Sequence, residues 1–212
     1  EEPADYSTAT AVFGMALAEN GMADFGPYAD YAEFGAALMS SYGDPETFAA
    51  AIADVPVDPD FNFTFNNDFL GINAGWNALL FGGTTTLNNT ENSWFEEMLV
   101  APEATLAGNA FVNNLRLMGT VSPGDGSIGT IHVGGEFNQV AGAIYALEVG
   151  SNESSDLIAV ADEAFIDDAA LVDVFTVGYV ADGDIFTILT ADNGLEGQYL
   201  SLIHISEPTR PY

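Results

Sequence analysis

The sequence lacks cysteine and lysine entirely, and its 212 residues include only two arginines, Arg116 and Arg210. The absence of cysteine excludes disulfides, thiol nucleophiles and thiolate metal sites. The 32 acidic residues give a formal net charge of −30, and such a field repels nucleic acid and anionic membranes while attracting cations. We therefore expect no nucleic-acid partner, and Ca²⁺ is the candidate bound cation.

The scarcity of basic residues also leaves trypsin-like proteases almost no cleavage site, which favours an extracellular or cell-surface location. The alternative is a salt-loving organism whose proteins are all acidic.

Apolar residues make up 48% of the chain, which is enough for a folded core. No apolar run approaches the ~18 residues of a membrane span. The chain starts at Glu1 without a signal-peptide pattern, so we expect a removed leader or a fragment.

The composition changes abruptly at the end of the chain, where the sequence reads LSLIHISEPTRPY. Residues 200–211 resemble the translation of a sequencing-library adapter, and the resemblance runs through all twelve positions. It implies that residues 200–212 are a non-native tail, to be left out of fold reasoning. The alternative is a genuine C-terminal strand with a loose end. No family resemblance is found for residues 1–199.

Residues 1–56 are expected to form a helical N-terminal segment. The stretch GDPETFAAAIADVP (43–56) has Asp44 as N-cap, Pro45 at the first helical position and Pro56 as a stop. Residues 28–41 predict a second helix by the spacing of their apolar residues. A third helix is expected over residues 8–20, although glycines weaken it.

Residues 57–199 are expected to form a β-rich domain, because the apolar period changes to two. In FNFTF, Phe61, Phe63 and Phe65 share one face. Residues 136–148 are ambiguous between helix and strand, residues 162–172 predict a short acidic helix, and no repeat of fixed period is visible. The predicted fold class is therefore α+β, mainly β, with helices followed by an antiparallel sandwich or barrel-like sheet. Further strands are expected at 76–81, 94–100, 110–118, 128–133, 174–180 and 185–190.

The sequence offers no recognisable catalytic constellation. His132 would have to be the base of a serine hydrolase, but it alternates with Ile131 and Val133 on a predicted strand, and no G-x-S-x-G turn supplies a nucleophile. Paired carboxylates could hydrolyse glycosides, yet a chain this acidic contains such pairs by chance, and adjacent strand residues face opposite ways. The chain is therefore predicted not to be an enzyme. The candidate acids are Glu96–Glu97, Glu136 and Asp167–Asp168.

Calcium is a more specific expectation. Asp125 in SPGDGS and both Asp182 and Asp184 in ADGD place short carboxylates in glycine-containing loops, where oxygen ligands can converge on a hard cation. Turn formation alone also explains these residues. No other cofactor is expected. Three glycosylation sequons begin at Asn62, Asn88 and Asn152.

These observations favour a secreted acidic structural or adhesive protein that self-associates, as a subunit of an extracellular filament, surface layer or matrix. Strand addition between subunits would be its natural mode of assembly. The first alternative is a carbohydrate-binding or carboxylate-dependent glycan-active module, with Trp76 or Trp94 stacking on sugar. The second alternative is a surface ligand-binding barrel of the lipoprotein kind.

Overall fold

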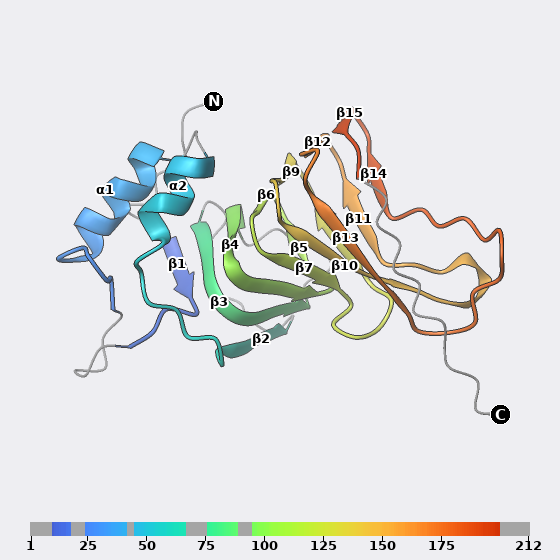
Figure 1. The fold of residues 1–212 in the computed structure, drawn as a ribbon, viewed down its shortest axis with the longest axis horizontal. Coiled ribbons are helices and arrows are strands. Elements are labelled where there is room, and N and C mark those ends of the chain that lie inside the picture. Colours follow the sequence, from blue (N-terminus) through green and yellow to red (C-terminus); the bar gives the residue numbers. More distant parts are fainter. Residues whose placement is uncertain (1–9, 18–23, 42–44, 67–75, 89–94, 200–212) are drawn as a thin grey trace.

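The structure is a computed structural model that describes residues 10–17, 24–41, 45–66, 76–88 and 95–199 (Figure 1). Every ladder between its named strands is parallel. The expected antiparallel sandwich or barrel is therefore wrong. Alternation of apolar and polar residues shows that one face of a strand is buried, but it is the same whether the neighbouring strand runs parallel or antiparallel.

The chain winds as a coil, and each turn of the coil adds one strand to each of three parallel ladders. This arrangement is a β-solenoid, in which each turn contacts only its neighbours. The turns are β4 (Phe95–Gly108), β5 (Phe111–Val112) and β6 (Asn114–Leu117); β7 (Thr120–Pro123), β8 (Thr130–Val133) and β9 (Phe137–Gln139); β10 (Ile144–Val149), β11 (Leu157–Val160) and β12 (Glu163–Ile166); and β13 (Leu171–Thr176), β14 (Leu189–Ala191) and β15 (Gly194–Gly197).

The turns differ in length, which explains why the sequence shows no fixed period. Along the ladder that contains β4, β7, β10 and β13, Thr105 pairs with Thr120, Thr120 with Ile144, and Ile144 with Leu171. The paired residues are therefore 15, 24 and 27 positions apart in sequence. A repeat search depends on constant spacing, whereas the ladders require only that the strands stay in register.

The helices lie inside the first turn and are not an N-terminal segment. β1 (Thr10–Phe13) and β2 (Asn62–Asn66) pair with the two halves of β3 (Trp76–Asn88), and α1 (Tyr31–Ser41) and α2 (Pro45–Ile52) lie between them in sequence. Met15 forms a bridge with Val57 where the inserted segment leaves and rejoins the coil. The predicted helices at 28–41 and 43–56 are confirmed, but the helix expected over 8–20 is wrong, because residues 10–13 form a strand beside β3.

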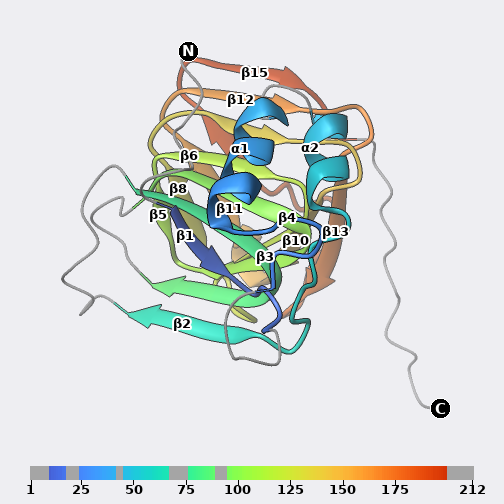
Figure 2. The same ribbon diagram turned by 90° about the vertical axis from the view of Figure 1, so that its left-hand side faces the viewer.

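Two apolar cores result from this arrangement. The first fills the inside of the coil with residues from all three ladders. The second lies between the helices and the outer face of β3 and β4, where Phe34 and Leu38 pack with Leu79 and Phe81. Figures 1 and 2 place α1 and α2 at the β1–β3 end of the coil, which we call the N-terminal end, far from β13–β15. The strand predicted at residues 76–81 is confirmed as part of β3. It is buried on both faces, because one face lines the interior of the coil and the other lies in the second core.

Two segments with helix-like spacing form strands and turns instead. Residues 136–148 contain β9, a turn at Gly142 with φ +78°, and β10. Residues 162–172 contain β12 and the start of β13, so the short acidic helix is wrong. Between these strands the Asp167 carboxylate accepts the Ala169 N–H at 2.9 Å. Such a local bond favours a turn over a helix.

Candidate functional site

The three residues predicted to bind calcium lie in turns. Asp125 has φ +53° in the connection between β7 and β8, and its Oδ2 lies 3.4 Å from the Thr86 hydroxyl, which donates to it. Asp184 lies on the long connection between β13 and β14, where its Oδ2 accepts the Ala181 N–H at 2.7 Å. Asp182 belongs to the same turn. Each carboxylate therefore has a place in a local turn, and calcium binding stays a prediction.

The residues weighed for catalysis are dispersed over the coil. Within the described ranges no group of three or more histidine or acidic side chains is arranged to hold a metal ion. His132 is exposed on the outer face of β8, where its ring stacks on Phe111 at a centroid distance of 6.3 Å. Glu96 is exposed and accepts a bond from Asn113, whereas Glu97 is only 8% exposed. The side chains of Trp76 and Trp94 lie outside the described part of the structure.

A buried carboxylate that the sequence analysis missed joins two turns of the coil. Asp156 is fully buried, and its two oxygens accept the N–H groups of Gly129 and Glu148, each at 2.8 Å. Burial raises the pKa of the Asp156 carboxyl to about 6, with a smaller contribution from the charge of Glu148 and an opposing one from the two backbone bonds. Its position before the apolar run LIAV is the only signal in the sequence. One donor, Glu148, is eight residues away in the same turn, and the other, Gly129, is 27 residues away in the turn before.

Two tyrosines continue this polar interior toward the last turn. The Tyr145 hydroxyl donates to the Ile188 carbonyl at 3.1 Å, and the Tyr199 hydroxyl donates to Gln139 Oε1 at 2.8 Å. Burial raises the pKa of both phenols well above the ordinary value. Gln139 in turn donates to the carbonyls of Ala143 and Leu171 at 3.0 Å. These bonds join the last described turn to the two turns before it.

The last turn is the most unusual surface of the molecule. In the described structure β13, β14 and β15 each pair with a strand on one side only, so three backbone edges are open at the same end. Elsewhere in the described residues only three large apolar side chains are exposed. We call the open edges of β13–β15, together with the exposed side chains of this turn, the C-terminal face. Its exposed apolar residues are Leu171, Phe175, Val177, Tyr179, Ile185 and Leu195.

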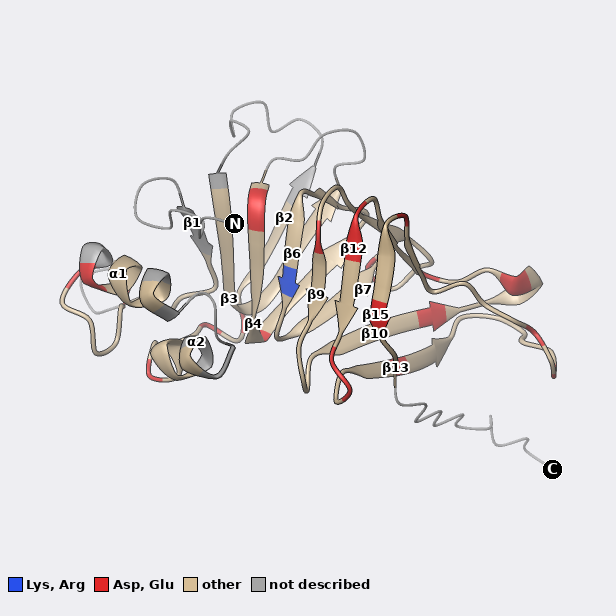
Figure 3. Ribbon diagram, turned by 90° about the horizontal axis from the view of Figure 1, so that it is seen from above, with Lys and Arg blue, Asp and Glu red and all other residues tan. Residues whose placement is uncertain are grey.

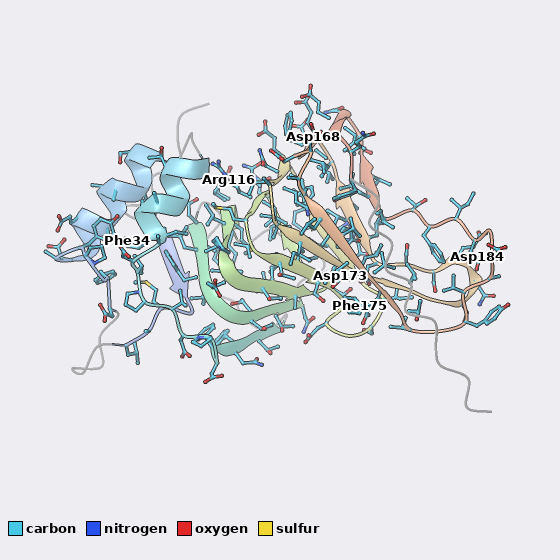
Figure 4. All side chains as sticks on the ribbon, viewed as in Figure 1. Phe34, Arg116, Asp168, Asp173, Phe175 and Asp184 are labelled. Atoms are coloured by element: carbon cyan, nitrogen blue, oxygen red, sulfur yellow. The ribbon has the colours of Figure 1, made fainter. Side chains whose placement is uncertain are left out.

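Charge on this face is entirely acidic. Figure 4 shows Asp173 and Phe175 on β13 and Asp184 far out on the connection that follows it. The one arginine of the described residues, Arg116, lies on β6 well away from them (Figures 3 and 4). A ligand for the C-terminal face must therefore satisfy open strand edges and apolar side chains while tolerating negative charge.

Fold and surface together define a parallel β-solenoid with an open last turn. Comparison with known protein families finds no family model that matches the chain, and comparison with curated proteins finds no match. In the part of the chain that the structure describes, no helix combines the length and apolar character needed to cross a membrane.

Proposed function

We propose that this chain is an extracellular or cell-surface structural or adhesive protein that works by self-association, as a subunit of a filament, surface layer or matrix. The observation that carries the proposal is the C-terminal face, with three open strand edges and the exposed side chains of Phe175 (48%) and Ile185 (80%). Uncovered edges are templates for pairing with another chain.

The charge of the chain sets the conditions for this association. At −30 per copy, two copies repel each other at low ionic strength, and salt shortens the range of that repulsion from about 30 Å at 0.01 M to about 3 Å at 1 M. If carboxylates bind divalent cations, these cations would promote association more strongly than NaCl of the same ionic strength. An acidic protein that assembles only in salt or calcium suits the extracellular medium better than the inside of a cell.

The test is the mass of the full chain in solution by light scattering, over a wide concentration range. We expect a monomer at about 0.05 M NaCl and association at about 1 M NaCl, where the repulsion is screened. A strictly monomeric chain at high concentration in both salts, and in millimolar CaCl₂, would overturn the proposal. Comparing CaCl₂ with MgCl₂ on the chain and on an Asp182→Asn/Asp184→Asn variant tests the calcium prediction separately.

A further inference from the structure

The corner of the coil between β14 and β15 carries an asparagine that is followed by glycine. Asn193 is exposed in the bend that joins these two strands, and Gly194 begins β15. Gly194 has φ +154°, and a Cβ there would meet only the Glu163 side chain, at 4.0 Å. Because this backbone conformation favours glycine, no side chain on residue 194 shields its peptide nitrogen from the Asn193 amide.

Asn193 is also bonded to the same corner of the turn before. The strands on both sides of the corner stay in register with those of that turn, so Asn193 lies over Asp162. Its backbone N–H donates to the Asp162 carbonyl at 3.2 Å, and its side-chain Nδ2 donates to Asp162 Oδ1 at 2.8 Å. An ionised carboxylate only accepts hydrogen bonds, so the second bond exists only while residue 193 keeps its amide.

We propose that Asn193 is a site of spontaneous deamidation and that its bond to Asp162 controls the rate. The Gly194 nitrogen attacks the side-chain carbonyl carbon of Asn193, the C–N bond of the amide breaks, and ammonia leaves with the proton that the Gly194 nitrogen gives up. The resulting succinimide takes up water and opens to aspartate or isoaspartate at residue 193, without oxidation or reduction. This inference does not depend on the proposed self-association.

The bond to Asp162 slows this reaction in the folded chain. Ring closure requires a rotation that brings the Asn193 amide carbon to the next peptide nitrogen, and the 2.8 Å bond to Asp162 opposes rotation of that side chain. The side chain is exposed, so the bond opens from time to time and the reaction proceeds. Removing the acceptor should therefore speed the deamidation of Asn193.

The product fits the corner less well than asparagine does. A carboxylate at residue 193 places a second acceptor and a second negative charge against Asp162 in place of a donor. Isoaspartate also lengthens the backbone path by one methylene group, which moves β15 relative to β12. Just beyond β15, Tyr199 donates to Gln139 in the interior. We therefore expect the last turn to loosen as the chain ages.

A single peptide reports this modification. A protease that cleaves after glutamate releases residues 164–196, in which Asn193 is the sole asparagine. The full chain is kept folded at neutral pH and physiological temperature, then denatured and digested at intervals. The mass increase of this peptide measures the conversion of Asn193. The other asparagine–glycine pair, Asn20 and Gly21, lies outside the described residues and in a different peptide.

Asn152 is the internal reference. It is exposed in the connection between β10 and β11, but it is followed by Glu153, whose side chain hinders ring closure. In the folded parent chain we expect Asn193 to react at least about tenfold faster than Asn152.

Two variants that each remove one charge test the control by Asp162. Asp162→Ala removes the acceptor, whereas Asp168→Ala removes an exposed carboxylate in the turn between β12 and β13 (Figure 4). Both leave Asn193 in the same peptide. We expect Asn193 to react at least about threefold faster in Asp162→Ala than in Asp168→Ala. Circular dichroism at the incubation temperature shows that each variant is folded.

Hydrogen exchange of the aged chain tests the consequence for β15. We expect the backbone N–H groups of residues 195–197 to exchange faster in the aged parent than in the fresh parent. The matched control is Asn193→Gln, which keeps an amide donor but closes a ring far more slowly, and its exchange should not change over the same time.

Each part of the inference has its own contrary result. If Asn193 reacts no faster than Asn152 in the folded parent, the deamidation site is wrong. Equal rates in Asp162→Ala and Asp168→Ala would show that Asp162 does not control the reaction. If the aged parent exchanges like aged Asn193→Gln, the loosening of β15 is wrong. None of these results bears on self-association, which is measured on freshly prepared chain.

Discussion

The N-terminal and C-terminal ends of this solenoid differ in the elements that lie beside their strands. At the N-terminal end an inserted helix pair adds a second apolar core, in which Phe34 lies within 6 Å of the ring centres of Phe25, Tyr28 and Phe81. In the last turns of the coil Asp156, Tyr145, Gln139 and Tyr199 form interior hydrogen bonds, and several large apolar side chains are exposed. Buried polar side chains also occur in β3 and β4. The helices therefore add buried contacts beside β3 and β4, whereas the described residues add none of this kind beside β13–β15.

This difference matters because a stacked coil gains stability from each contact between turns. A terminal turn has a neighbour on one side only. An end that packs against further elements of its own chain gains stability from them, whereas the last described turn lacks such contacts on one side. Changes at the two ends should therefore affect different measurements: unfolding free energy at the N-terminal end and assembly at the C-terminal end.

The largest expected effect is that of Phe34→Ala. Phe34 is fully buried between the helices and β3, and removing such a ring costs about 3 to 5 kcal/mol of unfolding free energy. Phe175→Ala is the matched control, because that ring is 48% exposed on β13 and surface changes stay within about 0.5 kcal/mol. Urea titration of the two variants at low salt, where we expect a monomer, measures both losses. Equal losses in both variants would show that the ends are not built differently.

A pair of glycine variants sharpens the comparison at the level of the backbone. Gly14 has φ +74°, and a Cβ there would lie 2.1 Å from the carbonyl oxygen of Gly82. Gly183 has φ +94° with nothing within 4 Å of its Cβ position. We expect Gly14→Ala to cost about 3 kcal/mol, the sum of left-handed strain and backbone overlap. Gly183→Ala carries only the strain, about 1 kcal/mol. If thermal unfolding shows the same loss of stability for both variants, the close approach of Gly14 to Gly82 is wrong.

Sequence patterns predicted the local structure better than the topology. The alternation in FNFTF gave β2 to within one residue, the spacing of apolar residues gave α1, and the proline signals gave α2. The predicted N-cap, Asp44, lies outside the described residues. Strand direction was not predictable, because it depends on which segments return to pair, and the turns of this coil differ in length. Short strands without a strong alternation were missed: β7 (TVSP), β11 (LIAV) and β15 (GLEG).

The exposed residues of the C-terminal face and the buried Asp156 were less predictable from the sequence than the strands and helices. Phe175 and Ile185 look like core residues in sequence, and two strands were expected around them at 174–180 and 185–190. Phe175 is exposed because it alternates with the inward-facing Val172 and Val174, and Ile185 lies on the connection between β13 and β14. Asp156 looks like one more surface acid, and its burial depends on bonds from Glu148 in the same turn and from Gly129 in the turn before. Such features depend on contacts between turns, which a single sequence does not reveal.

The smallest of these effects is a pH dependence that tests the polar interior of the C-terminal half. The pKa of the Asp156 carboxyl is raised from 3.8 to about 6, so the folded chain holds this proton more tightly than the unfolded chain does. Its contribution to stability is fully present below about pH 4 and is lost as the pH rises through 6. The difference corresponds to roughly 2 to 3 kcal/mol.

Urea titrations at pH values between about 4 and 7 measure this loss, at about 1 M NaCl so that the general repulsion among acids is screened. Asp156→Asn is the control: its amide cannot titrate, and it places a donor against one of the two N–H groups that the carboxylate accepts. We expect the Asp156→Asn variant to be less stable at every pH and to lose the decline between about pH 4 and 6. A decline of the same size in the variant would assign the pH dependence to other carboxylates.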